Sequence, residues 1–220
     1  MNGSIIQLLV LAGVAIFLIL KLRSVLGTRD GFEGPPEAKP LPGAGRARPE
    51  LEVIEGGPDR DITDHAPENS PAAIALAGMK RAEPSFAVGP FLQGARGAYE
   101  MILTAFAKSD LDKIRPFLSD EVAESFAGVF TDRKEKGLKV ESEILGIRDL
   151  ALHGAEFNPA TGEAEISVRF VAELVACTRD NAGEVIEGDP KKARKQKDIW
   201  TFGRRMGSDD PNWQLIATDE

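Results

Sequence analysis

The hydrophobic pattern of this chain changes its period once, at Gly137, and this change constrains the fold more than any other feature. Between residues 86 and 136, apolar residues recur every three or four positions, which is typical of amphipathic helices. From residue 138 to residue 218, apolar and polar residues tend to alternate, which is typical of strands. Because the helices precede the strands instead of alternating with them, we expect an α+β domain with an antiparallel sheet.

Three helices are expected before the change of period. The first has one apolar face, formed by Leu92, Ala95, Tyr99, Ile102 and Phe106. The second, over residues 109–118, is expected to start at Ser109 as its N-cap and to end or bend at Pro116. The third is expected to start after Ser119, to stop at Gly137 and to bury a stripe formed by Val122, Phe126 and Val129.

The second half of the chain contains strand patterns separated by turns. A long strand is expected over residues 138–157, with irregularities at Gly146 and Asp149, and a turn follows at Gly162. One face of the next strand carries Ile166, Val168, Phe170, Ala172, Leu174 and Ala176. Further strands are expected over residues 184–188, 197–205 and 212–218. We expect N-terminal helices packed on a curved antiparallel sheet, which makes a cone-like domain over residues 85–220.

An apolar run at the start of the chain predicts a membrane anchor. The sixteen residues from Ile5 to Leu20 include one strongly polar side chain, Gln7, and basic residues follow the run instead of preceding it. A spanning helix needs about 20 apolar residues, and positive flanks remain in the cytoplasm. We therefore expect one transmembrane helix within residues 1–26, with the N-terminus outside a bacterial inner membrane and the remainder in the cytoplasm. A cleaved signal peptide and a buried core helix are the alternatives.

Residues 27–84 have the composition of a disordered tether. They hold nine of the fourteen prolines, and residues 30–83 contain eleven acidic and six basic side chains. Such a segment buries too little apolar surface to offset its ordering entropy. Within it, residues 71–84 are interpreted as a nascent turn of the linker, with a docking helix as the alternative.

Composition argues against several classes of function. The expected domain is acidic, with 24 acidic and 18 basic residues over 84–220, which argues against general nucleic-acid binding. One cysteine, Cys177, and two distant histidines, His65 and His153, offer no spacing for a metal site. No acid is expected beside Tyr99, the single tyrosine, and no catalytic motif is present. We therefore expect no enzyme activity, no cofactor and no metal.

Two groups of residues are candidate binding sites. The first is a cluster of five cations formed by Lys191, Lys192, Arg194, Lys195 and Lys197. It is expected either to be a solvated loop or lysine-blunted edge strand, or to contact anionic lipid headgroups. The second group is expected in the interior of the cone, either as a filled core or as the lining of an apolar pocket. It consists of Phe106, Phe126, Phe170, Trp200 and Leu215.

Five segments in this order resemble the Tim44-like domain family over about residues 84–220. They are FLQGARGAYEMILTAFAKSD, LSDEV, EVIEGDP, DIWTFGRR and PNWQLIAT. The resemblance implies a cone-like fold similar to that of nuclear transport factor two, and an adaptor in place of a catalyst. It also implies partners at the inner membrane, namely translocase-associated proteins and anionic lipid.

The resemblance has a limit in the N-terminal part of the chain. Family members recruit the import chaperone through a long charged N-terminal region, and this chain has an anchor and a proline-rich tether there instead. A chaperone is therefore the weakest of the implied partners. The sequence as a whole predicts a membrane-anchored adaptor in protein transport, with a small-molecule-binding or enzymatic cone-fold domain as the alternative.

Overall fold

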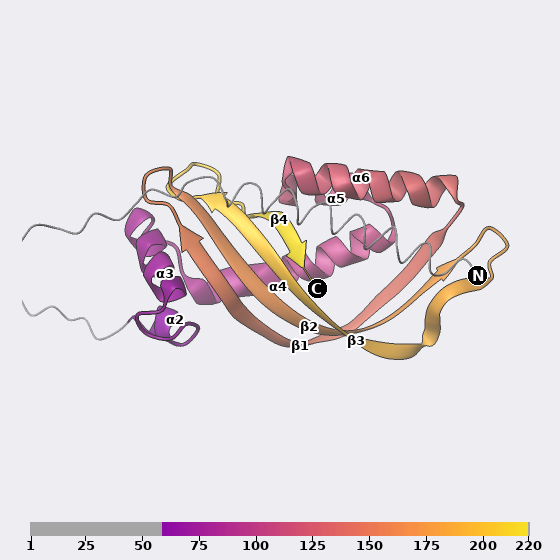
Figure 1. The fold of residues 1–220 in the computed structure, drawn as a ribbon, viewed down its shortest axis with the longest axis horizontal. Coiled ribbons are helices and arrows are strands. Elements are labelled where there is room, and N and C mark those ends of the chain that lie inside the picture. Colours follow the sequence, from indigo (N-terminus) through magenta and orange to yellow (C-terminus); the bar gives the residue numbers. More distant parts are fainter. Residues whose placement is uncertain (1–58, 220) are drawn as a thin grey trace, which may run out of the picture. The chain divides into compact units, whose positions relative to one another are not determined.

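The computed structural model describes residues 59–219, which form helices followed by a four-stranded sheet (Figure 1). The helices are α2 (Arg60–Thr63), α3 (Pro71–Ala82), α4 (Val88–Ala107), α5 (Leu111–Ile114), the 3-10 helix η1 (Arg115–Phe117) and α6 (Asp120–Glu135). The strands are β1 (Lys139–Phe157), β2 (Glu163–Arg179), β3 (Val185–Arg205) and β4 (Gln214–Asp219). The predicted α+β class with helices on an antiparallel sheet is confirmed.

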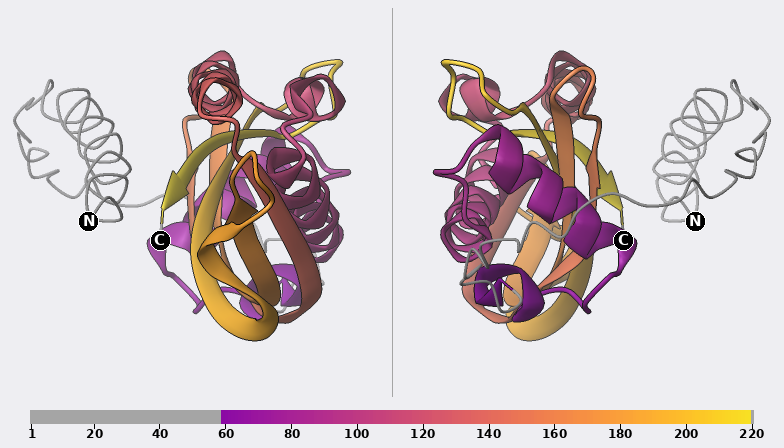
Figure 2. Two further views of the ribbon diagram at one scale, coloured as in Figure 1. Left: turned by 90° about the vertical axis from the view of Figure 1, so that its right-hand side faces the viewer. Right: turned by 90° about the vertical axis from the view of Figure 1, so that its left-hand side faces the viewer.

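The sheet has the order β1-β2-β3-β4, and every neighbouring pair is antiparallel. At its centre Val168 of β2 lies opposite Leu152 of β1 and Trp200 of β3. The register shifts at three places along β1, and two of them lie at the irregularities predicted around Gly146 and Asp149. Such shifts bend strands, and the sheet curves around α4, which crosses its inner face (Figure 2).

The buried core lies between α4 and the inner face of β2. Four of the five predicted residues of α4 are buried, and Phe106, nearer the helix end, is partly buried. On β2, five of the six predicted residues are buried, namely Ile166, Val168, Phe170, Ala172 and Leu174. Each large apolar side chain that is fully buried here stabilises the fold by about 1.5–3 kcal/mol.

Two details of the helices differ from the prediction. Ser109 does not cap α5, because it lies in the left-handed region, with φ of 53°, just beyond the end of α4. The N-cap of α5 is Asp110, whose side chain accepts from the backbone N–H of Lys113. Val129 is 38% exposed, so the predicted buried stripe of α6 ends before it. Ser119 caps α6 as predicted, and Gly137, with φ of 63°, lies just beyond the end of that helix.

The strands expected over residues 184–188 and 197–205 are parts of one strand, β3. Arg194 pairs with Leu174, whereas Asp189 pairs with Ala176, so residues 190–193 form a bulge opposite a single residue of β2. Pro190 lies in this bulge, and a proline is tolerated there because a bulged residue donates no ladder hydrogen bond. The sequence pattern breaks at the bulge, while the backbone continues in the same direction.

The interpretation of residues 71–84 as a nascent turn in the tether is wrong. Ser70 caps α3 by accepting from the backbone N–H of Ala73 at 3.1 Å, and Pro71 occupies the first turn. Leu76 and Met79 of α3 are fully buried in the core against β1. The Ser70-Pro71 pair is a sequence signal for the start of a helix. The wrong prediction followed because α3 is alanine-rich, with few large apolar residues, and is stabilised by a strand far from it in the sequence.

The predicted transmembrane helix lies outside the described residues. Within residues 59–219, none of the helices is both long enough and apolar enough to cross a bilayer.

Candidate functional site

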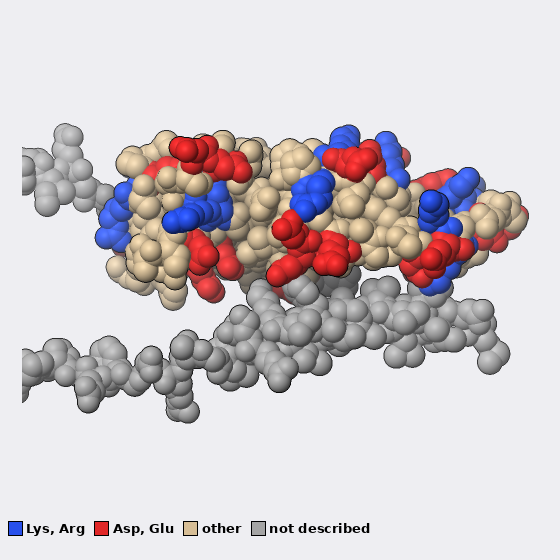
Figure 3. Space-filling view, turned by 90° about the horizontal axis from the view of Figure 1, so that it is seen from above, with Lys and Arg blue, Asp and Glu red and all other residues tan. Residues whose placement is uncertain are grey.

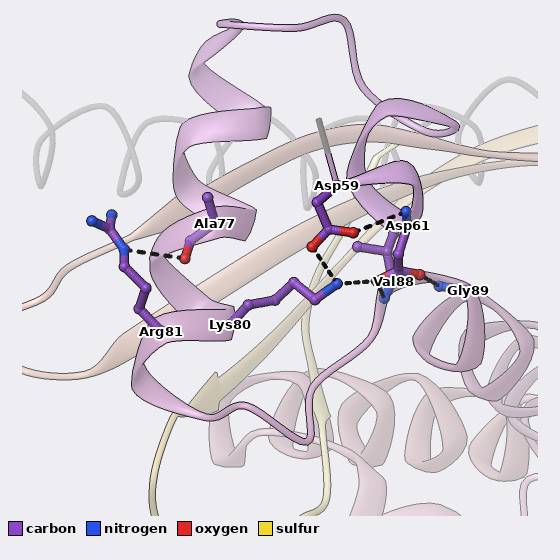
Figure 4. A network of polar contacts seen from close by, with 7 residues as sticks. All are labelled: Asp59, Asp61, Ala77, Lys80, Arg81, Val88 and Gly89. Carbon is purple, nitrogen blue, oxygen red and sulfur yellow. Dashed lines mark hydrogen bonds and ion pairs between the residues drawn. The ribbon is translucent and has the colours of Figure 1, made fainter. Parts of the chain in front are cut away.

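A network of ionic and backbone contacts fixes α3 beside the start of α4 (Figure 4). The carboxylate of Asp61 accepts from the backbone N–H groups of Val88 and Gly89 at 2.8 and 3.0 Å, at an N-terminus whose own N-cap residue offers no side-chain bond. The ammonium group of Lys80 on α3 contacts Asp59 at 2.7 Å and Asp61 at 2.8 Å. Asp61 therefore stabilises the first turn of α4 and joins it to α3.

The contacts of Asp61 lower its pKa. Burial by itself raises the pKa of this carboxyl group, but the hydrogen bonds from Lys80, Gly89 and Val88 outweigh burial, and the net shift is downward. The pKa of Lys80 rises in spite of its burial, because Asp59 and Asp61 stabilise its charged form. Both shifts favour the ionised pair, so the network contributes to folding while Asp61 is ionised.

An open apolar groove of about 950 Å³ runs between α3 and the end of β1. Most of its lining residues are apolar or glycine, namely Pro71, Ile74, Ala75, Gly78, Ala82, Ala155, Phe157 and Pro159. The charged residues of the lining are Arg81 and Glu156. Ile74 is 61% exposed, which is high for a large aliphatic side chain beside other apolar groups.

The glycine in this groove sets how closely α3 approaches β1. A Cβ atom at Gly78 would lie 2.7 Å from the ring of Phe157, so a side chain at this position would push the helix or the ring away. A second depression of about 530 Å³ adjoins the groove and shares Ala82, Phe157 and Pro159 with it. The lining of this depression is more polar than that of the groove and includes Thr161, Arg205 and Asp209, so the apolar surface is that of the groove itself.

Glu83, directly after α3, ties the same end of the domain to β3. Its carboxylate pairs with Arg204, whose side chain is 7% exposed, and accepts from the backbone N–H of Gly207 at 3.0 Å. The bonds from Arg204 and Gly207 outweigh burial and lower the pKa of Glu83. The guanidinium carbon of Arg204 lies 5.8 Å from the centre of the Trp213 ring. The charged contacts of Lys80 and Glu83 therefore both fix the C-terminal end of α3, whereas its N-terminal end is capped by Ser70.

The predicted pocket-lining residues separate into two groups. Phe170, Trp200 and Leu215 are buried in the core, where the ring of Tyr99 stacks on Phe170 with ring centres 4.3 Å apart. Phe106 and Phe126 are partly buried, and their rings meet edge to face at 4.6 Å between α4 and α6. The first group has the packing of a filled core, and a pocket lined by all five residues stays a prediction.

The expectation that no acid lies beside Tyr99 is wrong. The hydroxyl group of Tyr99 donates to the carboxylate of Asp198 at 2.5 Å, and the amide of Gln196 donates to both oxygens of the same carboxylate at 3.0 Å. Asp198 is 5% exposed. Burial, then the hydrogen bond to Asp198 and then the negative charge of that carboxylate raise the pKa of Tyr99 far above its ordinary value. This contact could not be predicted from local sequence patterns because the two residues are 99 positions apart.

The predicted basic cluster lies on β3, and all five of its side chains are exposed. Lys191 and Lys192 are in the bulge, whereas Arg194, Lys195 and Lys197 lie next to β2 in regular pairing. The cluster therefore belongs to a strand and its bulge, and contact with anionic lipid headgroups stays a prediction. On the face shown in Figure 3, acidic and basic side chains are interspersed. The basic cluster of β3, which contains cations alone, is therefore a local departure from this mixed surface charge.

The histidines and carboxylates of the described region do not gather into a metal site. No group of three or more His, Cys, Asp or Glu side chains between residues 59 and 219 is arranged to hold an ion. His65 and His153 are both exposed, and they lie in the α2–α3 connection and in β1.

Comparison with known proteins supports a single family. A family model described as the Tim44-like domain matches residues 72–220. The mitochondrial import inner membrane translocase subunit TIM44 of Homo sapiens is 29% identical over 147 residues, covering 64% of this chain and 31% of that protein. TIM44-1 of Arabidopsis thaliana is 21% identical over 163 residues, covering 71% of this chain and 34% of that protein. The chain thus spans about a third of the length of these relatives.

One solved structure also aligns with the chain. It is the intermembrane space region of the chloroplast protein ARC6, at 12% identity and a TM-score of 0.39, covering 58% of this chain and 94% of that chain.

Replacing Asp61 is expected to weaken folding and to change its pH dependence. We expect Asp61→Asn to lower the free energy of unfolding by about 1–3 kcal/mol, because a charged acceptor of two amides is lost. The pKa of Asp61 is lowered by folding, so its contribution is complete above the ordinary value of 3.8 and is lost as the pH falls through the lower folded pKa. Urea unfolding at several acidic pH values measures both effects. Asp64→Asn, at an exposed neighbour, is the matched control, and equal losses in both variants would contradict the assigned role.

The single tyrosine allows a direct test of the buried pair. Folding raises the pKa of Tyr99, so its contribution is complete below the ordinary value of 10.0 and is lost as the pH rises toward the folded pKa. In an absorbance titration, the folded chain should show no phenolate signal below about pH 11, whereas the chain in urea should titrate normally. We expect Asp198→Asn to bring the onset to lower pH. A folded wild-type chain that ionises near its ordinary pKa would contradict the buried contact.

Proposed function

The chain belongs to the Tim44-like domain family, and from this premise we propose that it is an adaptor that binds other proteins at a membrane. The relatives named above are subunits of the mitochondrial inner-membrane import translocase. Because the chain matches about a third of their length, the domain is the part that this proposal carries over. The proposed partners are membrane proteins or proteins associated with a translocase.

The observation that supports binding most directly is the open apolar groove beside α3. Enzymes usually enclose converging ionisable groups in a cleft, whereas an adaptor needs an apolar or charged surface that faces outward. The groove is open to solvent, and the exposed Ile74 is one of its lining residues. We propose that an apolar segment of a protein partner packs against Ile74, Ala75 and Phe157.

The place of action is the second part of the proposal. We propose that the apolar run within residues 1–26 anchors the chain in a bacterial inner membrane, with residues 27 onward in the cytoplasm. Tethering raises the effective concentration of the domain at the bilayer, so weak contacts with membrane partners become occupied. We propose that anionic lipid headgroups are then also within reach of the basic cluster.

A small-molecule-binding or enzymatic domain is the second candidate, and the Tyr99–Asp198 pair is the observation behind it. The two side chains are buried in the core, and neither of them lines the groove or the adjoining depression. The ring of Tyr99 stacks on Phe170, and the amide of Gln196 donates to Asp198. The adaptor therefore accounts better for the surfaces that the domain presents.

Photo-crosslinking in native membranes tests the adaptor role. A photoreactive residue at Ile74 of the full-length chain is expected to form adducts with a membrane or translocase-associated protein. The same residue at Val129, which is 38% exposed on α6, is the matched control and should not form those adducts. Deletion of residues 1–26 should reduce the yield, because the effective concentration falls. Adducts with lipid alone, or the same adducts from both positions, would contradict a protein-binding groove.

Protease protection tests the orientation. In inverted inner-membrane vesicles, added protease is expected to digest the chain beyond Arg29, because the cytoplasmic side faces outward. In right-side-out vesicles the same residues should be protected until detergent is added. Full protection in the inverted vesicles would refute the proposed orientation, and release of the chain by alkaline carbonate would refute the anchor.

A further inference from the structure

We propose that the free edge of β3, over residues 191–198, binds an acidic extended segment of a partner protein as an added strand. The inference rests on the proposed adaptor function and gives the chemistry of one partner. We call this stretch the basic edge. Adding a strand to an open sheet edge is a common way to recognise a peptide, with affinity from backbone hydrogen bonds and specificity from alternate side chains.

The first observation is an unpaired backbone. β4 pairs with β3 from Ile199 to Gly203, and its last described residue, Asp219, lies opposite Ile199. Before Ile199, the strand neighbour of β3 within residues 59–219 is β2 alone. Within residues 59–219, the side of β3 that β4 covers from Ile199 onward therefore carries no second strand along residues 194–198. Residues 191–193 belong to the bulge, where the backbone N–H of Lys191 donates to the side chain of Asp189 at 2.9 Å. Unpaired backbone donors and acceptors on such an edge are a template for an incoming strand.

The second observation is the charge of this edge. Residues 191–197 contain five cations and no acid, although the described domain as a whole is acidic. Within the described part of the chain, none of the five side chains forms an ion pair. Glu173 lies opposite Lys195 on β2, but its carboxylate pairs with Arg148 instead. The cations are thus available to an external acidic partner.

The same lysines select which strand is accepted. Lysine on an edge protects a protein from pairing with its own copies, because two identical basic edges repel each other. The repulsion does not apply to an acidic strand, for which each opposite-charge pair across the ladder is favourable. The edge therefore combines repulsion of a second copy with attraction of an acidic segment, which is how specificity is usually obtained.

The geometry favours a strand over a bilayer as the occupant. Successive side chains of a strand point to opposite faces of the sheet, so Lys195 and Lys197 lie on one face and Arg194 lies on the other. A membrane surface that meets one face contacts part of the cluster, whereas an added strand places side chains beside both faces. A strand also satisfies the backbone groups of the edge, which lipid headgroups do not align with residue by residue.

The basic edge and the apolar groove lie at separate places on the sheet, with the groove at the end of β1 beside α3 and the basic edge along the middle of β3 (Figure 1). The groove involves Ala155 and Phe157 at the end of β1, where β2 begins, and the basic edge lies beside the second half of β2. Two partners can therefore occupy the two surfaces at the same time, as an adaptor requires.

Hydrogen exchange with a defined probe tests the inference. The probe is an alternating peptide, acetyl-Glu-Val-Glu-Thr-Glu-Val-Glu-amide, added to the full-length chain in nonionic detergent. We expect it to protect backbone amides within residues 191–198 from exchange, and Lys195→Glu/Lys197→Glu to weaken its binding by at least about tenfold. Lys113→Glu/Lys134→Glu changes the charge equally at exposed positions on α5 and α6, and should bind within about twofold of the wild type.

Peptide variants and vesicles separate the alternatives on the wild-type chain. A peptide with central proline has the same charge but cannot complete the ladder, and it should not bind; equal binding would mean that charge alone is recognised. Binding of phosphatidylglycerol vesicles together with no binding of the acidic peptide would assign the edge to lipid and overturn the inference. Binding of an otherwise identical lysine peptide would also overturn it. If the photoreactive residue at position 74 formed no protein adducts while the acidic peptide still protected residues 191–198 from exchange, the proposed groove would be refuted and the basic edge would stand.

Discussion

The contact of α4 with the inner face of the curved sheet is the constraint on which the rest of the structure depends. Tyr99 lies at its centre, stacked on Phe170 and hydrogen-bonded to Asp198, so a single side chain joins the helix to β2 and β3. A buried carboxylate is costly unless its oxygens are satisfied, and here the Tyr99 hydroxyl and the Gln196 amide satisfy them. This polar contact fixes one register between helix and sheet, where apolar contacts alone would permit several.

The groove follows from how α3 is attached to this framework. Lys80 connects α3 to Asp61, which stabilises the first turn of α4, and Glu83 connects the end of α3 to Arg204 of β3. Leu76 and Met79 bury one face of α3, and Ile74 on the other side is left exposed. The contacts of Lys80, Glu83, Leu76 and Met79 hold α3 in place while the apolar side chain of Ile74 stays exposed.

The two surfaces of the domain differ in chemistry. The groove is apolar and lies where α3 meets the end of β1, and the basic edge is charged and has an unpaired backbone. Proteins that use such different surfaces can hold unlike partners without competition between them. The chain belongs to the Tim44-like domain family, and the proposed adaptor role assigns a different kind of partner to each of these surfaces.

Residue patterns determined the class of the fold and the identity of its inner face. The change of period at Gly137, the apolar positions of β2 and the Ser119 cap could be predicted because each depends on neighbours within a few residues. The candidate cations were also predictable from composition. The assignment of α3 to the tether and the separation of β3 into two strands were wrong, because α3 is stabilised by β1 and the bulge at 190–193 is bridged by β2.

Tertiary structure decided which residues meet. The sequence does not show that Asp198 faces Tyr99, that Asp61 caps a helix starting 27 residues later, or that within residues 59–219 β4 pairs with β3 from Ile199 to Gly203. These contacts depend on the register of long strands and on the packing of a helix across them. A local pattern specifies which face of an element is buried, and only the folded chain specifies what lies against that face.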